Sequence, residues 1–172
     1  MSRNRTLWPA VPFFMAHDEG GSQDITTAGL FLTWDTIDYQ TSHFNYTADD
    51  DAVFIAHTFS GMIRIMFEVS ANPYGGTAPT YIKLYKNDVA VDGAYSYFTP
   101  IYDNQSSFGE HVSLTFADYF EKDDKIQIYG DAIANTCRTI AHTSRLILEF
   151  LPFRGWNNNH GGRWQYTGRV LR

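Results

Sequence analysis

The sequence of 172 residues has a single cysteine, no long apolar run and few charged side chains. Because Cys137 stands alone, an intrachain disulfide and a cysteine-built zinc site are both excluded. No apolar run approaches the roughly 20 residues of a membrane-spanning helix, and residues 7–14 are too short and proline-interrupted for a signal peptide. Charged residues make up only 19% and aromatic residues 16%, which excludes a disordered polar chain and a coiled coil. A packed domain with its own core remains.

Acidic residues are missing from both ends of the chain. Residues 1–6 carry two arginines and residues 154–172 carry four, in each case without an acid. The stretch 7–153 therefore holds seven basic residues against all 19 acids, a formal charge of −12. An acidic body with two basic ends predicts that the ends contact a partner.

Apolar and polar residues alternate in short runs, which is the period of half-buried strands. In residues 62–71 the odd-numbered side chains predict a buried face and the even-numbered ones a mixed outer face. Turn residues such as Asn87-Asp88 separate the runs, so we predict an all-β, antiparallel jelly-roll sandwich. The other expected strands are 30–34, 52–58, 81–85, 94–101, 112–116, 125–129 and 145–151, and one helical turn is expected at 117–121.

The strong alternation starts near residue 30 and ends near residue 151, which predicts three parts. Residues 1–29 form an N-terminal arm with one short strand near residues 10–16. Residues 30–151 form the jelly-roll domain, and residues 152–172 form a basic, aromatic C-terminal arm.

Residues that catalysis needs form no recognisable pattern in this chain. Six histidines are scattered, Gly-x-Ser-x-Gly does not occur, and the glycine pairs lack the spacing of a phosphate-binding loop. We therefore predict a protein that is not an enzyme and uses no cofactor or metal. One acidic run, Asp49, Asp50 and Asp51, offers oxygen ligands to a hard cation such as calcium. It lacks the spaced ligands of a dedicated loop, so a solvated turn is favoured and cation binding stays open.

The two arms carry the residues that we predict to bind a partner. In the C-terminal arm, arginines are interleaved with aromatic side chains, a combination that suits nucleic acid or a protein surface. The acidic body would repel nucleic acid, which favours a protein partner, including a second copy of the chain. The predicted partner-binding residues are Arg3, Arg5, Arg154, Trp156, Arg163, Trp164, Tyr166, Arg169 and Arg172.

Aromatic residues of the body are expected to lie mostly in the core. A carbohydrate-binding face would need several aromatic rings exposed on one side of the molecule. The residues expected in the core include Phe54, Phe67, Phe98, Phe116 and Phe150.

An ordered set of short motifs runs along the chain between about residues 30 and 151. The motifs are residues 31–36 (Phe-Leu-Thr-Trp-Asp-Thr) with Tyr39, residues 43–45, 54–65, 81–88, 119–128 and 144–150. Together they resemble the jelly-roll superfamily of complement globular heads and tumour necrosis factor. The chain departs from that pattern at Met62, where an aromatic residue usually follows the glycine, and at Asp88, where the family has glycine.

The resemblance implies a homotrimer that packs around an aromatic and aliphatic seam. Trp-Asp-Thr at 34–36 followed by a tyrosine most resembles versions found in bacteriophage and other virus particles. This implies a virion structural protein, a capsid decoration, spike or fibre-head component made in the host cytoplasm and anchored to a capsid or neighbouring virion protein by its arms. The alternative is a trimeric extracellular module that binds a host-surface glycan or a receptor, as the cellular members of the superfamily do. No membrane partner is expected.

Overall fold

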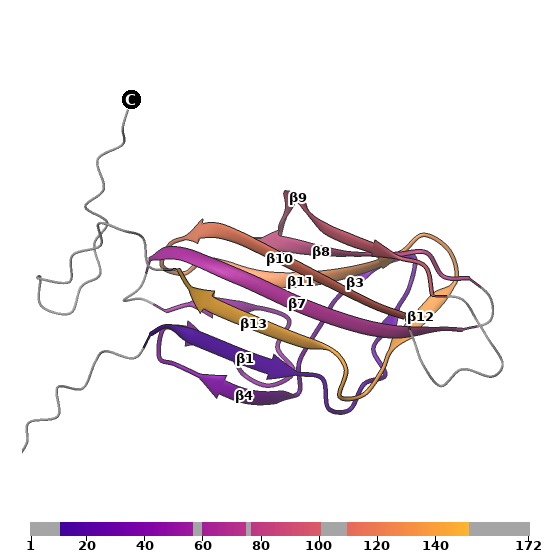
Figure 1. Ribbon diagram of the computed structural model, residues 1–172, viewed down its shortest axis with the longest axis horizontal. Coiled ribbons are helices and arrows are strands. Elements are labelled where there is room, and N and C mark those ends of the chain that lie inside the picture. Colours follow the sequence, from indigo (N-terminus) through magenta and orange to yellow (C-terminus); the bar gives the residue numbers. More distant parts are fainter. Residues whose placement is uncertain (1–10, 57–59, 75–76, 101–109, 152–172) are drawn as a thin grey trace, which may run out of the picture.

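Two antiparallel sheets packed face to face make up the residues that the computed structural model describes, which are 11–56, 60–74, 77–100 and 110–151 (Figure 1). Among these residues, no helix has the length and apolar composition needed to cross a membrane. The predicted all-β sandwich is confirmed. Its strands are β1 (Phe13–His17), β2 (Asp24–Ile25), β3 (Leu30–Phe31), β4 (Thr36–Gln40), β5 (Phe44–Asn45), β6 (Val53–Ile55), β7 (Gly61–Tyr74), β8 (Thr80–Lys86), β9 (Val89–Phe98), β10 (Glu110–Phe120), β11 (Lys125–Ala132), β12 (Thr136–Thr139) and β13 (Arg145–Phe150).

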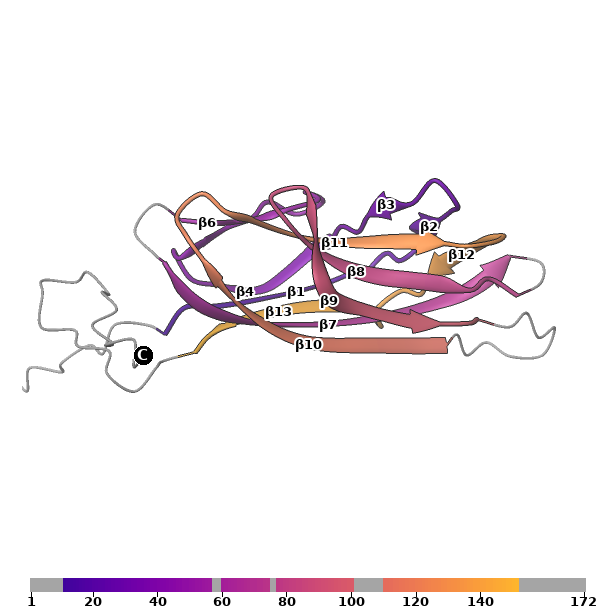
Figure 2. The same cartoon turned by 90° about the horizontal axis from the view of Figure 1, so that it is seen from above.

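The seven-stranded sheet is organised around β7. One edge of β7 pairs with β10, and its other edge pairs with β13 and then with β12. Strands β1 and β4 continue the sheet beyond β13, and β2 continues it beyond β12. The six-stranded sheet has the order β5-β6-β11-β8-β9, with β3 also paired to β11. Figure 2 shows this sheet lying over the seven-stranded one.

The core lies between the two sheets and follows the predicted alternation. In β7, Ile63, Ile65, Phe67 and Val69 are at most 1% exposed, while the even-numbered residues 62–68 lie on the outer face. The opposite sheet contributes inward side chains such as Ile128, which is fully buried. Period-2 pleating therefore separates a dry inner face from a mixed outer face.

Strand β10 continues to Phe120, so the helical turn expected at residues 117–121 is wrong. Residues 110–120 pair with β7 along their whole length, ending with Phe120 opposite Gly61. Phe120 is fully buried and completes the period-2 alternation of the strand. Pairing with a long neighbour satisfies the backbone groups that a helical turn would satisfy locally.

The short strand expected near residues 10–16 is present as β1, but it is part of the folded body and not of an arm outside it. Strand β1 lies between β13 and β4, and β2 pairs with β12. Phe14 and Ala16 are fully buried on the inner face. Residues 13–25 therefore belong to the folded body.

Most of the aromatic residues expected in the core are there. Phe67, Phe98 and Phe150 are buried, and Phe116 packs against the core while partly exposed. Phe54 differs, because it is 42% exposed. Its neighbours on either side along β6 point inward, so the pleat turns Phe54 outward.

A buried polar network fixes the chain between β1 and β3. The carboxylate of Asp18 is buried and accepts hydrogen bonds from Gly21 N (2.7 Å), Gln23 Nε2 (2.9 Å) and Thr139 Oγ1 (3.0 Å). The Gln23 amide also pairs with the backbone of Thr33, donating to its carbonyl and accepting from its N–H, both at 2.8 Å. The bonds from Gly21 and Gln23 to Asp18 are local, whereas Thr139 reaches Asp18 from a distant part of the chain and Gln23 holds Thr33. The network therefore sets the path into β2 and β3.

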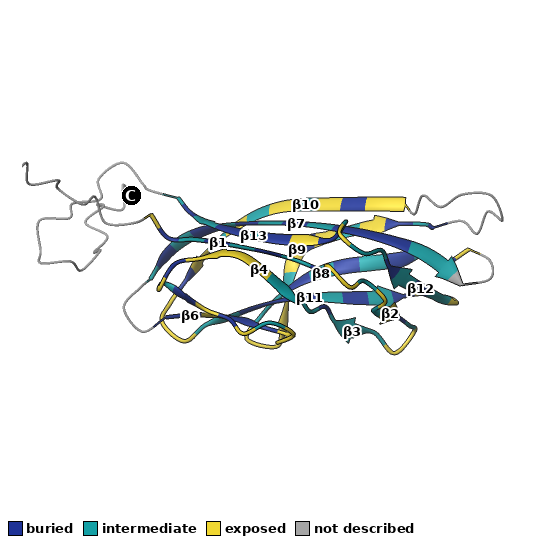
Figure 3. Cartoon of the chain, turned by 90° about the horizontal axis from the view of Figure 1, so that it is seen from below, coloured by how far each residue is buried: buried dark blue, intermediate teal, exposed yellow. Residues whose placement is uncertain are grey.

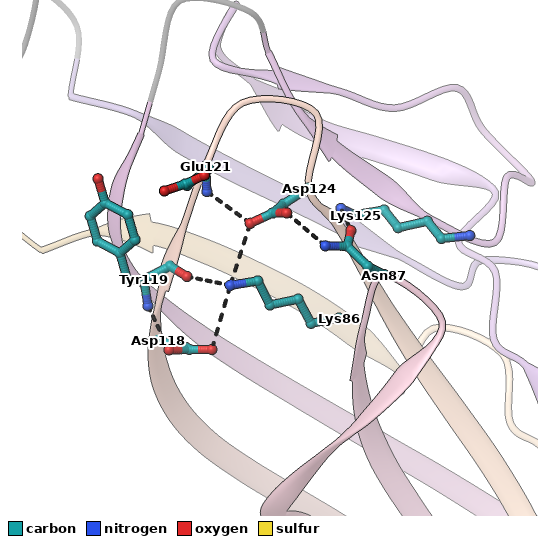
Figure 4. Close-up of polar contacts among 7 residues, drawn as sticks. All are labelled: Lys86, Asn87, Asp118, Tyr119, Glu121, Asp124 and Lys125. Carbon is teal, nitrogen blue, oxygen red and sulfur yellow. Dashed lines mark hydrogen bonds and ion pairs between the residues drawn. The ribbon is translucent and has the colours of Figure 1, made fainter.

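A second polar cluster joins the two sheets where β10 ends (Figure 4). The ammonium of Lys86, on β8, donates to the Tyr119 carbonyl at 2.6 Å and lies 3.4 Å from Asp124 and 3.9 Å from Asp118. Its Nζ also lies 4.6 Å from the centre of the Phe120 ring, a cation–π distance. One lysine of the six-stranded sheet thus binds the end of a strand in the other sheet.

The turn between β8 and β9 is part of the same cluster. Asn87 and Asp88 both have positive φ, 53° and 67°, as a two-residue hairpin turn of type I′ requires, which confirms the predicted turn. Asn87 Nδ2 donates to Asp124 at 2.6 Å, and Asn87 Oδ1 accepts from Lys125 N at 2.9 Å. Burial opposes ionisation of Asp124, but hydrogen bonds from Glu121 N and Asn87 and the charge of Lys86 lower its pKa.

We predict that Lys86→Gln destabilises the fold by about 1–3 kcal/mol, because it removes charged hydrogen bonds between the sheets. Lys122→Gln is the matched control, since Lys122 is 53% exposed and pairs with an exposed aspartate. Urea unfolding at neutral pH measures both. The lowered pKa of Asp124 means that its stabilisation is present above pH 3.8 and is lost as the pH falls below that value. The difference between Lys86→Gln and wild type should therefore shrink at pH 2–3, and equal effects of the two variants at neutral pH would contradict the role of Lys86.

Candidate binding surfaces

The predicted partner-binding residues all lie outside the described residues. Val11 and Leu151 are the first and last described positions, and they are the points from which the two end segments start. These points are neighbours, because Phe150 N donates to the Pro12 carbonyl at 3.1 Å and Phe13 pairs with Glu149 (Figure 1). The residues outside the description are Arg3, Arg5, Arg154, Trp156, Arg163, Trp164, Tyr166, Arg169 and Arg172.

The outer face of the seven-stranded sheet carries a row of apolar side chains. Strand register places Tyr39 beside Met15, Met15 beside Ile147, and Ile147 beside Met66. Thr115 on β10 follows Met66 at the edge of the sheet. Tyr39 is 52% exposed and the other three are partly exposed. We call Tyr39, Met15, Ile147 and Met66 the apolar row; Figure 3 shows how exposed the flanking strands β4 and β10 are.

Charged side chains beside the apolar row are matched with partners on neighbouring strands. On either side of the row, register sets a basic residue of one strand opposite an acidic residue of the next. This leaves the rows around the apolar row close to neutral in a chain body that is strongly acidic. The pairs are Arg64 with Glu149 and Arg145 with Glu68 (3.3 Å). Between β1 and β4, His17 Nδ1 lies 2.9 Å from Asp38 Oδ2, although register sets His17 opposite Thr36.

The outer face of the six-stranded sheet carries aromatic rings from four neighbouring strands. Tyrosines two residues apart in β8 and in β9 point to the same side, away from the core. Register brings them beside rings from β11 and β3. We call this surface the aromatic face, and its residues are Phe31, Tyr81, Tyr85, Tyr95, Tyr97 and Tyr129.

One half of the aromatic face is a group of three rings. Phe31, Tyr85 and Tyr129 have centroid separations between 5.0 and 5.3 Å. The hydroxyl of Tyr129 donates to the Ala28 carbonyl at 3.0 Å, and burial raises its pKa. Gly29 lies against this ring with φ +68°, and a Cβ there would sit 2.0 Å from the hydroxyl oxygen. Glycine adopts this positive φ readily and leaves room for the Tyr129 ring against the backbone. The loop before β3 therefore holds the ring of Tyr129 in place.

The other half joins tyrosines to an ion pair. Tyr81 contacts Tyr95 and Tyr97 with centroid separations of 5.8 and 5.0 Å. Lys83 Nζ lies 5.2 Å from the centre of the Tyr81 ring and donates to Asp131 at 2.9 Å. The hydrogen bond to Asp131 raises the pKa of Lys83 although burial opposes it. The aromatic face was not predicted from the sequence. The one pattern that could have indicated it is the Tyr-x-Tyr spacing within an expected strand.

The acidic run at 49–51 belongs to a loop that packs on Tyr46. The Tyr46 hydroxyl donates to the Trp34 carbonyl at 2.7 Å and lies 3.0 Å from the Asp50 carbonyl, and burial raises its pKa to about 12. The Asp50 carboxylate accepts from Thr47 N at 3.3 Å, beside an open pocket of about 330 Å³. In the part of the chain that the structure describes, no three His, Cys, Asp or Glu side chains are grouped as a metal site requires.

A serine and a histidine lie together on the outer face of the seven-stranded sheet. Ser70 Oγ is 3.0 Å from His111 Nδ1, which is the contact that a nucleophile and its base would make. No carboxylate among the described residues bonds to His111, and Ser70 is 7% exposed. The pair is therefore a side-chain hydrogen bond between β7 and β10, without the third group that orients a catalytic base.

Comparison with known proteins places the fold. No protein-family model matches the sequence, and no curated protein matches it. Among solved structures, murine APRIL at pH 8.5 matches with a TM-score of 0.57 and 8% identity, over 83% of this chain and 100% of that chain. Eiger TNF from S. frugiperda matches with a TM-score of 0.52 and 11% identity, over 95% of this chain and 100% of that chain. The fold is a tumour necrosis factor-like jelly roll.

The matches confirm the predicted jelly roll. In this tumour necrosis factor-like sandwich, the apolar row and the aromatic face lie on the outer surfaces of opposite sheets. Neither match bears on a viral origin, which stays a prediction. At these identities the likeness shows the fold alone, so partner and assembly have to be argued from the surfaces.

We predict that Gly29→Ala perturbs the aromatic face, whereas Gly93→Ala does not. Both glycines have positive φ, +68° and +73°, but among the described residues no heavy atom beyond the adjoining residues lies within 4 Å of a Cβ added at Gly93. Gly93→Ala should cost about 1 kcal/mol of backbone strain and Gly29→Ala at least about twice as much, because Tyr129 must also move. Urea unfolding and the near-UV circular dichroism of the tyrosines measure the difference. Identical spectra and stabilities of the two variants would show that Gly29 does not fix Tyr129.

Proposed function

We propose that this protein is a non-enzymatic recognition module that assembles as a homotrimer through the outer face of its seven-stranded sheet. The apolar row carries the proposal. A row of apolar side chains, one exposed and three partly exposed, that crosses four neighbouring strands is unusual on a sheet face left in water, and such patches mark interaction sites. The three-fold packing around an aromatic and aliphatic seam that the sequence resemblance implies needs a face of this composition.

The charges around the row suit burial against another copy of the chain. Arg64 and Glu149 already neutralise each other, as do Arg145 and Glu68. Covering them leaves no isolated charge without a partner, which is the costly outcome in an interface. A second copy of the chain would bring the same near-neutral face to the contact. Contact through other parts of the acidic body would instead bring like charges together. The module that results presents its other sheet to a glycan or receptor.

Ile147→Glu should convert the protein from a trimer to a monomer. Light scattering of the wild type is expected to give three times the 19.6 kDa chain mass. A carboxylate at the centre of the apolar row would be buried without a partner in the assembly. Ile133→Glu is the matched control, since Ile133 is 57% exposed in the turn after β11, and it should keep the trimer mass. Far-UV circular dichroism establishes that both variants fold, and a monomeric wild type would refute the proposal.

A virion role is the second candidate, favoured by the place where the chain ends start. The two segments that carry all six terminal arginines start from neighbouring points, at Val11 and Leu151, beside the hydrogen bond between Pro12 and Phe150. Basic segments that start side by side suit attachment to one acidic partner, such as a capsid or a neighbouring virion protein.

Removing residues 154–172 should therefore leave the trimer mass unchanged while abolishing attachment to virus particles. Light scattering measures the mass, and co-sedimentation with particles measures the attachment. A truncated protein that still sediments with the particles would contradict anchoring through this end. Truncation within residues 1–6 gives the comparison for the other end.

A further inference from the structure

We infer that the aromatic face of the six-stranded sheet binds a neutral carbohydrate. The inference names the ligand class of the recognition module proposed above and rests on that proposal. It is carried by six aromatic side chains gathered on one side of the molecule, around the ion pair of Lys83 and Asp131.

The face offers ring surfaces that are open to a ligand. Tyr95 is 54% exposed and Tyr97 is 48% exposed, both on the edge strand β9. Tyr81 and Tyr129 are partly exposed and lie behind them. Tyrosine combines an apolar ring with a hydroxyl, so one residue type packs against the C–H face of a sugar and hydrogen-bonds to its hydroxyls.

The rings are held in place before any ligand arrives. They stand on paired strands and pack edge to face against one another, as Phe31 does against Tyr85 and Tyr129. The Ala28 carbonyl and Gly29 fix Tyr129. A preorganised surface loses little side-chain entropy on binding, which matters for a weakly binding ligand such as a sugar.

The ion pair at the centre of the aromatic face favours a carbohydrate ligand over a protein ligand. Lys83 and Asp131 are each about one-third exposed or less, at 29% and 32%. A dry protein interface would strip water from both charges, which costs stability unless new partners replace it. Sugar hydroxyls are donors and acceptors at once, so they replace that water on the ammonium and on the carboxylate.

The charge of the body decides between neutral and acidic sugars. Residues 7–153 carry a formal charge of −12, and the ammonium of Lys83 is already neutralised by Asp131. An anionic sugar would meet repulsion, and the described residues of this face offer no free cation to offset it. The face spans four strands, about 14 Å across at the usual strand spacing, which suits a short oligosaccharide rather than one monosaccharide.

The test is binding of the 172-residue protein to an array of neutral oligosaccharides, with maltohexaose, cellohexaose and N-acetylchitohexaose measured individually by titration calorimetry. At least one neutral glycan should bind, and sialylated and sulfated glycans on the same array should not. The double variant Tyr95→Ala/Tyr97→Ala should weaken binding by at least about tenfold, and Tyr97→Phe should weaken it less because the ring remains.

Tyr119→Ala is the matched control for these variants. Tyr119 is 43% exposed but lies on β10, in the opposite sheet, so affinity per site should not change. An array without neutral hits overturns the inference, as does equal binding by wild type and the double variant, or loss of binding in Tyr119→Ala.

Light scattering of the same samples separates this inference from the proposed trimer. A blank array with a trimeric mass refutes the carbohydrate ligand alone. Binding by a monomeric wild type refutes the trimer alone. Binding of a protein partner that the double variant loses, with a blank glycan array, reassigns the aromatic face to protein.

Discussion

The pleat of β7 is the constraint on which the rest of the structure depends. Fourteen residues alternate between two faces, so Ile63, Ile65 and Phe67 enter the core while Arg64 and Met66 face outward. Three strands take their register from β7, and the outer rows of the sheet follow from that register. The same alternation therefore produces the hydrophobic interior and the apolar row, and a one-residue slip would exchange them.

Two polar clusters determine where strands begin and end at the two ends of the sandwich. The hydrophobic core alone does not determine these positions. Apolar contact is non-directional, so it holds the sheets together without specifying where each strand begins. Lys86 binds the end of β10, where Phe120 faces Gly61 at the start of β7. The Asp18 network reaches Thr139, which pairs near the other end of β7. Directional hydrogen bonds at both ends thus set the strand positions that apolar packing leaves open.

Sequence reasoning succeeded where burial follows hydropathy and failed where it does not. Residues 62–71 alternate strongly, so their strand and its buried face were predictable. Strand β4 has exposed residues from Ile37 to Gln40, so it has no buried face from which hydropathy could predict a strand. Tyrosine occurs both in the core and on the surface of proteins. The spacing of Tyr95 and Tyr97 therefore predicts that they share a face of the strand, but not whether that face is buried or exposed. The ion pair of β8 and β11 depends on a register between strands far apart in sequence, which no local pattern carries. The predicted arm residues fall outside the described residues and stay predictions.

The placement of the two surfaces on opposite sheets has a consequence for binding. An assembly that covers the apolar row leaves the aromatic face of every copy open, because the outer faces of two packed sheets point in opposite directions. A homotrimer then presents three copies of a sugar site on one rigid body. Individually weak sites become effective when a multivalent glycan surface engages several at once, since later contacts form at high effective concentration. The proposed self-association and the proposed ligand recognition would therefore support each other without sharing a residue.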